Sequence, residues 1–265
     1  MAKNKSFIKL DGTLDGLTFY RANGQDFVKT KGEINRQRIL TDPAFARTRE
    51  NMVEFGGAAT AGKAFRAVFA VVLKVMADSY MGARANAIIK RILNLGTGPR
   101  GQREINMEGN GYLLKGFDFN TTPFTSIFFA PNTAPTVSAG RDNLSWTVAD
   151  FNTQAFVRAP EGATHFKLVL AGGYLSNYQY QMMMGLYEPE NPNVNAIGGV
   201  SYSDAIPLGG MVGADTTLTL DLSSVGTVPV TSILLGAVGI VFYQQVNADF
   251  YELAQNNAMK VVVIG

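Results

Sequence analysis

His165-Phe166-Lys167-Leu168-Val169-Leu170 is the stretch that decides the fold. Phe166, Leu168 and Leu170 occupy alternate positions, and successive side chains of a β-strand point to opposite faces of the sheet. The alternation predicts a strand with one face in an apolar core. By the same alternation, the single histidine of the chain, His165, faces away from that core.

Similar segments recur on both sides of this stretch, at intervals of about 10–20 residues, with Gly, Pro and Asn between them. Such regular spacing is typical of two packed antiparallel sheets. Residues 105–265 are therefore predicted to form an all-β, immunoglobulin-like sandwich. The predicted strands are residues 112–119, 126–130, 143–149, 165–171, 178–186, 200–206, 216–222, 231–243 and 257–264.

Residues 43–95 carry helical patterns instead. Asp42 is suited to be an N-cap with Pro43 at the first helical position. Gly56-Gly57 is predicted to bend the chain before a largely apolar, buried helix at about residues 60–77. A third helix is predicted to end near Leu95, with Gly96 as its left-handed C-terminal residue and a boundary loop after it.

Residues 6–31 are predicted to form a small antiparallel meander. Its strands begin at Phe7, Leu17 and Asp26, with turns at Asp11-Gly12 and Asn23-Gly24; Asn-Gly between β-rich runs is a strong hairpin signal. Three short strands bury too little surface to be stable alone, so we expect the meander to dock on another surface. The candidate interface residues are Phe7, Ile8, Leu10, Leu17, Phe19, Tyr20 and Phe27.

The sequence thus predicts an α+β protein with three regions. These are a β-meander assembly arm at residues 1–32, a basic helical region at residues 33–104 and an acidic β-sandwich region at residues 105–265. The helical region and the sandwich are each expected to have a core.

Charge divides the chain unevenly. Residues 1–104 carry 18 Lys/Arg and 9 Asp/Glu, a net charge of +9, and residues 105–265 carry 5 and 12, a net charge of −7. Such polarity indicates either a nucleic-acid contact or attraction between copies of the chain. The candidate basic contact surface is Arg36, Arg38, Arg47, Arg49, Arg84, Lys90, Arg91, Arg100 and Arg103.

Catalytic and metal-binding patterns are weak. One histidine and no cysteine leave no ligand set for zinc, and no G-x-S-x-G elbow accompanies His165. Residues 57–64 match a phosphate-binding P-loop except that Ala64 replaces the Ser or Thr that binds Mg²⁺, and the preceding residues look helical rather than β. We therefore predict no enzyme activity, no cofactor and no metal.

The apolar stretches at residues 64–77 and 233–243 are shorter than the roughly 18 apolar residues that a membrane helix needs. The N-terminal residues lack the apolar segment of a signal peptide. We expect a cytoplasmic protein without a membrane span.

Four blocks of the chain resemble a family of Bacteroidota proteins of about this length. They begin at Ile8-Lys9-Leu10-Asp11-Gly12, Asp42-Pro43-Ala44-Phe45, Pro160-Glu161-Gly162-Ala163 and Phe242-Tyr243-Gln244-Gln245. The resemblance covers nearly the whole chain and implies a bacterial source, but no activity. The chain departs from the family pattern at Asn247-Ala248, where relatives carry Asn-Gly.

These features predict a non-enzymatic structural subunit that forms a homo-oligomer such as a filament, tube or particle. Two alternatives stay open. One is a nucleic-acid-associated protein that uses the basic helical region, and the other is a component of a phage or phage-like particle.

Overall fold

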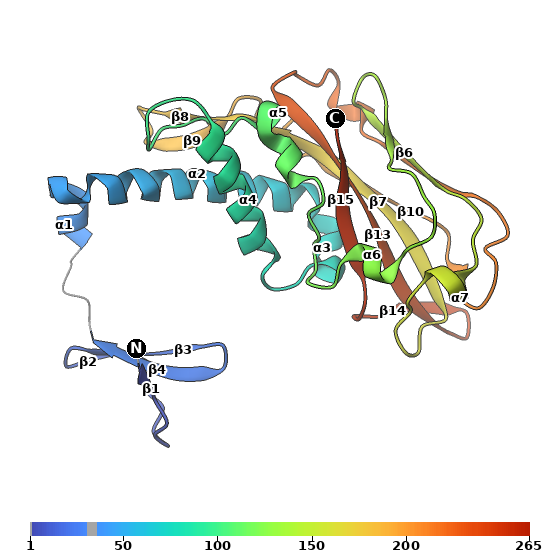
Figure 1. Cartoon of the computed structure of the whole chain (residues 1–265), viewed down its shortest axis with the longest axis horizontal. Coiled ribbons are helices and arrows are strands. Elements are labelled where there is room, and N and C mark those ends of the chain that lie inside the picture. Colours follow the sequence, from blue (N-terminus) through green and yellow to red (C-terminus); the bar gives the residue numbers. More distant parts are fainter. Residues whose placement is uncertain (1, 31–35) are drawn as a thin grey trace. The chain divides into compact units, whose positions relative to one another are not determined.

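Strand β7 (His165–Ser176) lies at the centre of an antiparallel six-stranded sheet (Figure 1). It pairs with β13 (Ser232–Val246) along its whole length, from Ser176 opposite Ser232 to His165 opposite Tyr243. The sequence prediction for both strands is confirmed. The other members are β10 (Gly198–Tyr202) and β11 (Ile206–Pro207) beside β7, and β14 (Asp249–Glu252) and β15 (Ala258–Ile264) beside β13.

A second, three-stranded antiparallel sheet covers one face of this sheet. It has the order β12 (Thr216–Asp221), β6 (Asn143–Val148), β5 (Thr136–Val137). Trp146 on β6 is fully buried with Phe166 and Leu168 of β7 in one apolar core. The alternation at residues 165–170 therefore has the predicted consequence, because Phe166, Leu168 and Leu170 all point into this core.

Helices cover the opposite face of the six-stranded sheet (Figure 1). Phe65 and Phe69 pack with Val169 of β7 and Val241 of β13 in a second core. The helices therefore share their core with the sheet rather than forming one among themselves. The helices on this side are α2 (Ala46–Val68), α3 (Ala70–Met76) and α4 (Met81–Leu95).

The computed structural model describes residues 2–30 and 36–265, and it divides the chain into two units, Met1–Arg49 and Glu50–Gly265. This division differs from the boundary expected near residue 104, because the helices after residue 50 and the sandwich strands share one core. Part of the expected region 33–104 lies at residues 33–35, outside the described residues.

The first unit contains a four-stranded antiparallel sheet with the order β1 (Ala2–Lys3), β4 (Gln25–Thr30), β3 (Leu17–Ala22), β2 (Gly12–Leu14). The Asn23-Gly24 turn is confirmed, and both residues have the positive φ that the hairpin requires (49° and 73°). The first turn is at Asp15-Gly16, not Asp11-Gly12, and residues 7–10 are not a strand. Leu14 pairs with Leu17 across this turn, which sets the register of β2.

After this sheet come α1 (Arg36–Thr41) and the short 3₁₀ turn η1 (Pro43–Phe45). Asp42 caps η1 as predicted, since its carboxylate accepts the Ala44 backbone N–H at 2.9 Å.

Several local predictions in the second unit are wrong. Gly56-Gly57 lies within the uninterrupted helix α2, and the helical path breaks at Phe69 instead. Gly96 has an ordinary φ of −70°; its lack of a side chain matters because a Cβ there would overlap the Glu104 carbonyl. Residues 112–119 and 126–130 are not strands but mainly short helical turns, with the bounds η2 (Gly111–Leu114) and α6 (Phe124–Ile127).

The remaining elements connect these layers. Strands β8 and β9 replace the single strand expected at residues 178–186 and form a separate two-stranded hairpin. The bounds are α5 (Met107–Asn110), α7 (Thr153–Phe156), β8 (Tyr178–Gln181), β9 (Leu186–Pro189) and η3 (Ser223–Val225). In the described part of the chain, no helix has the length and apolar character needed to cross a membrane.

Gly57 allows α2 to approach the β9 hairpin closely, and this leads to a prediction with a matched control. A Cβ on Gly57 would overlap the Tyr187 ring, whereas a Cβ on Gly56 would meet nothing within 4 Å. Gly57→Ala is expected to lower the free energy of unfolding by about 1–3 kcal/mol through overpacking. Gly56→Ala should instead raise it by up to about 1 kcal/mol, because Ala favours helix. Urea unfolding of both variants checks this; equal effects would contradict it.

Candidate assembly interface

The N-terminal sheet presents apolar side chains without a core beneath them. None of residues 2–30 and 36–49 is buried. Phe7 is 93% exposed, and the other apolar residues before β3 are also exposed. A folded domain normally buries such side chains, so the described part of this unit lacks an apolar core of its own.

The strand register separates the two faces of this sheet. Phe19 pairs with Val28, and Leu14 pairs with Leu17, which places these four side chains on one face. Ala2 joins them opposite Val28. This apolar face includes Leu14 and Val28, which are not among the interface residues predicted from the sequence. Their alternation with Thr13 and Phe27 could have identified them once the register was known.

The other face is mixed. Tyr20 and Phe27 stack with ring centroids 5.6 Å apart, and the Lys29 ammonium lies 5.4 Å from the Tyr20 centroid. The predicted interface residues therefore divide between the two faces. Leu17 and Phe19 lie on the apolar face, Tyr20 and Phe27 on the mixed face, and Phe7, Ile8 and Leu10 in the exposed segment before β2.

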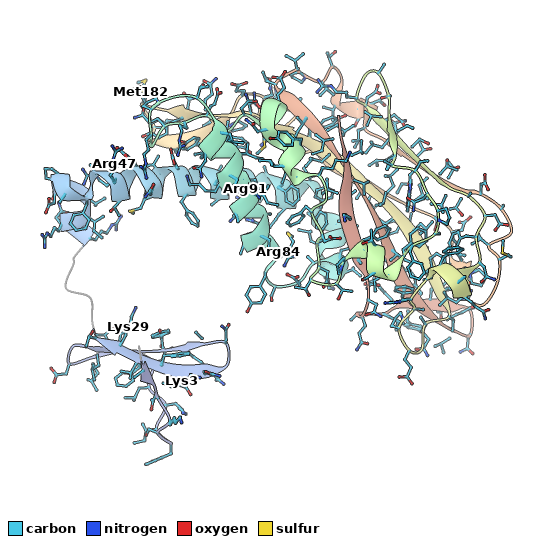
Figure 2. All side chains as sticks on the ribbon, viewed as in Figure 1. Lys3, Lys29, Arg47, Arg84, Arg91 and Met182 are labelled. Carbon is cyan, nitrogen blue, oxygen red and sulfur yellow. The ribbon has the colours of Figure 1, made fainter. Side chains whose placement is uncertain are left out.

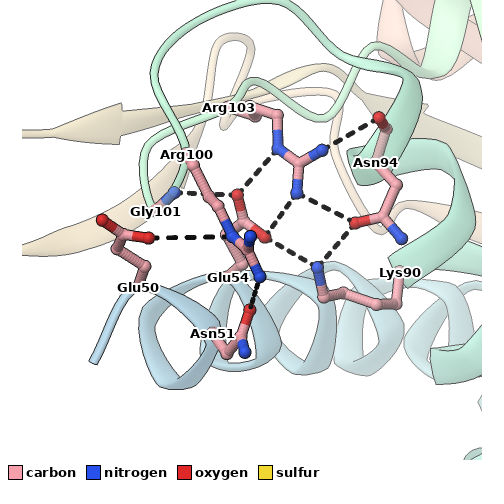
Figure 3. Close-up of polar contacts among 8 residues, drawn as sticks. All are labelled: Glu50, Asn51, Glu54, Lys90, Asn94, Arg100, Gly101 and Arg103. Carbon is pink, nitrogen blue, oxygen red and sulfur yellow. Dashed lines mark hydrogen bonds and ion pairs between the residues drawn. The ribbon is translucent and has the colours of Figure 1, made fainter. Parts of the chain in front are cut away.

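The predicted basic surface is largely engaged in contacts within the chain. At least six of its nine side chains make hydrogen bonds or ion pairs to their own unit, three of them shown in Figure 3. Arg84, for example, donates to both carboxylate oxygens of Asp78 at 2.9 and 2.8 Å. The six are Arg38, Arg49, Arg84, Lys90, Arg100 and Arg103; Arg36, Arg47 and Arg91 are exposed on α1, α2 and α4.

Two of these residues, Arg103 and Lys90, bind a buried carboxylate (Figure 3). Glu54 on α2 is fully buried and accepts two hydrogen bonds from Arg103, both at 2.8 Å. Lys90 of α4 donates to it at 2.7 Å, and the Gly101 backbone N–H at 2.9 Å. Arg100 lies nearby, 3.7 Å from Glu50. The cluster therefore ties α2 to α4 and to the loop after α4.

The electrostatics of the cluster follow from these contacts. Burial raises the pKa of Glu54, but the hydrogen bonds from Arg103, Lys90 and Gly101 outweigh it and lower the pKa to about 2. Glu54 is thus a charged structural group rather than a poised acid or base. Arg49, five residues before Glu54, does not take part in this cluster and donates to the backbone carbonyls of Ile39 and Asp42.

The candidate chemical residues do not converge. Residues 57–64 lie within helix α2, so the near match to a P-loop has no loop in which to hold phosphate. His165 is half-buried, with its ring centroid 4.9 Å from that of Phe250. Within residues 2–30 and 36–265, no group of three or more His, Asp or Glu residues is arranged to hold a metal ion.

Comparisons with known protein families, curated proteins and solved structures gave no match.

Proposed function

We propose that this protein is a non-enzymatic structural subunit that assembles with copies of itself into a filament, tube or other particle. The observation that carries the proposal is the N-terminal sheet, which has an apolar face, two strand edges and no buried residue among those described. A partner surface would remove the apolar side chains from water and satisfy the edge backbone groups. A particle of phage origin would use the same physics.

The second unit supports this role as a folded platform. We propose that its sandwich is immunoglobulin-like. The supporting observation is the arrangement of the strands in the two sheets. The neighbours β5, β6 and β12 in one sheet correspond to immunoglobulin strands A, B and E. The neighbours β10, β7, β13 and β15 in the other correspond to strands C′, C, F and G. Domains of this architecture are common in binding and adhesion, but the architecture alone assigns no function.

Electron microscopy of the purified full-length chain, combined with sedimentation velocity over a range of concentrations, tests the proposal. Ordered particles or a concentration-dependent series of oligomers are expected. A chain that stays monomeric at all concentrations would contradict self-assembly. Nucleic-acid association is the weaker alternative, because most of the proposed basic surface is already paired; a gel shift by the monomer would favour it.

Salt dependence provides a further prediction. If the basic and acidic parts of neighbouring copies meet, assembly should slow as the Debye length falls from about 10 Å at 0.1 M salt to about 3 Å at 1 M. Preformed particles should survive the same increase, because apolar contacts are not screened. Light-scattering kinetics at both salt concentrations measure the effect. Equal rates would remove charge polarity as a contribution to assembly.

A further inference from the structure

Strand β14 is the least protected edge of the six-stranded sheet. It pairs with only the last four residues of β13, and all four of its own residues are exposed. Residues 244–252 have no buried member, although the Phe250 ring packs against His165 and Tyr243 on one face of the hairpin. Its two-residue turn forms at Asn247-Ala248, with Asn247 at a φ of 58°. An exposed edge of this kind is suited to pairing with another strand.

The hairpin combines apolar and acidic side chains. Val246, Phe250 and Tyr251 are each between 42% and 56% exposed. Asp249 and Glu252 are the charged residues of β14, and within the described part of the chain neither forms an ion pair. The edge therefore offers apolar contact area together with uncompensated negative charge.

The N-terminal sheet has one edge of opposite charge. Its terminal strand β1 contains Lys3, and Lys5 follows it; neither has an ion-pair partner among the described residues (Figure 2). The opposite edge, β2, is flanked by Asp11 and Asp15, which would repel an acidic strand. Charge thus distinguishes the two edges of this sheet.

A shallow groove lies beside the basic edge. It has a volume of about 400 Å³ and is lined by Ala2, Leu17 and Val28 of the apolar face, with Lys29 and Thr30. A strand added alongside β1 would extend the sheet and place the side chains of one of its faces next to this groove. The exposed aromatic side chains of β14 are of a kind suited to fill it.

We propose that β14 of one copy adds to the β1 edge of the N-terminal sheet of a second copy. The pairing rests on the proposed self-assembly and names its contact. Successive side chains of β14 lie on opposite faces, so one of the two acids, Asp249 or Glu252, lies on the same face as Lys3. The aromatic side chain on the other face of β14, Phe250 or Tyr251, then lies beside the groove at Ala2, and the second acid adds its charge along the same edge. Because the two surfaces differ, the contact is head-to-tail and repeats along a chain of copies.

Charge reversal on either side of the contact, in two variants of the full-length chain, tests the pairing. One variant carries Lys3→Glu and Lys5→Glu, and the other carries Asp249→Lys and Glu252→Lys. Each alone juxtaposes like charges and should raise the concentration needed for assembly by about tenfold or more at 0.1 M salt. An equimolar mixture should restore assembly, because every contact in an alternating chain then joins opposite charges.

The matched control reverses two exposed acids on other elements, Glu108→Lys and Glu188→Lys. Glu188 lies on β9, at the end of the second unit away from β14 (Figure 1). The control should assemble at the wild-type concentration. Circular dichroism establishes that all variants are folded before sedimentation is compared.

The outcomes separate this inference from the proposed function. Wild-type behaviour of both reversal variants, or a loss that mixing does not restore, overturns the β1–β14 pairing while wild-type particles still support self-assembly. A loss repaired only when all four substitutions are in one chain overturns the contact between copies and indicates pairing within the chain. Wild-type chains that never assemble overturn the proposed function itself.

Discussion

Deletion of residues 1–32 is expected to abolish assembly while leaving the rest of the chain folded. The buried members of both apolar cores lie between Ala58 and Val261, so the deletion removes none of them. It does remove the apolar face formed by Leu14, Leu17, Phe19 and Val28. Burial of one large apolar side chain contributes about 1.5–3 kcal/mol. The binding free energy lost with this face therefore exceeds what polar contacts at the edge of the interface contribute, even after the entropic costs of association.

Circular dichroism and light scattering on the truncated chain measure both parts of this expectation. A folded monomer is the expected result. Particles that form as readily as those of the full chain would refute the role of the arm. An unfolded or aggregated product would indicate that the N-terminal sheet completes the fold of its own chain.

A pair of point variants locates the effect on one face. Leu14→Asn with Leu17→Asn replaces two apolar side chains that are paired across the β2–β3 turn. Thr13→Asn with Thr18→Asn introduces the same residue at the adjacent pair, whose side chains lie on the opposite face. The Leu variant should lose assembly and the Thr variant should largely retain it. Equal losses would show that the strands, rather than the apolar face, are what matters.

Glu54→Gln is expected to destabilise the second unit strongly. The substitution removes the carboxylate that neutralises the Arg103 guanidinium and the Lys90 ammonium. Removing one partner of a buried ion pair costs about 3–5 kcal/mol. Glu50→Gln, one turn earlier on α2, is the control. Its partner Arg100 is about half exposed, so the cost should be about 1 kcal/mol or less.

The low pKa of Glu54 adds a pH signature to this prediction. Its fall from the ordinary value of 4.5 to about 2 is a stabilising contribution of about 3 kcal/mol above pH 4.5, lost as the pH falls toward 2. Between pH 7 and pH 3, Glu54→Gln should therefore lose about 2 kcal/mol less stability than the wild type. Urea unfolding at the two pH values measures this difference. Identical losses would mean that Glu54 does not carry the acid sensitivity.

Local patterns were enough to predict several strands and one turn. The alternation at residues 165–170 identified β7 and its buried face, and Asn23-Gly24 identified the turn of the β3–β4 hairpin. Both signals depend on backbone geometry within a few residues, which the sequence expresses directly. The strands predicted at residues 112–119 and 126–130 are wrong. These apolar runs have no clear alternation, and a short buried run fits a helical turn as well as a strand.

The candidate interface was only partly predictable for a related reason. The N-terminal residues were identified as apolar and too few to form a core. Which of them share a face depended on the register of β2, and the sequence placed the first turn four residues too early. A register error transfers side chains to the opposite face, because the strand period is two.

By itself, the sequence determined the α+β character of this protein, its central strands, its charge polarity and the small size of its N-terminal sheet. Only the tertiary structure decided that the helices pack on the sheet and that Glu54 meets Lys90 and Arg103, 36 and 49 residues away. It also decided that β14 has an open edge. Strand and turn patterns arise from interactions between near neighbours in the chain. Partners distant in sequence are instead selected by packing and by the need to neutralise buried charge, which no local pattern records.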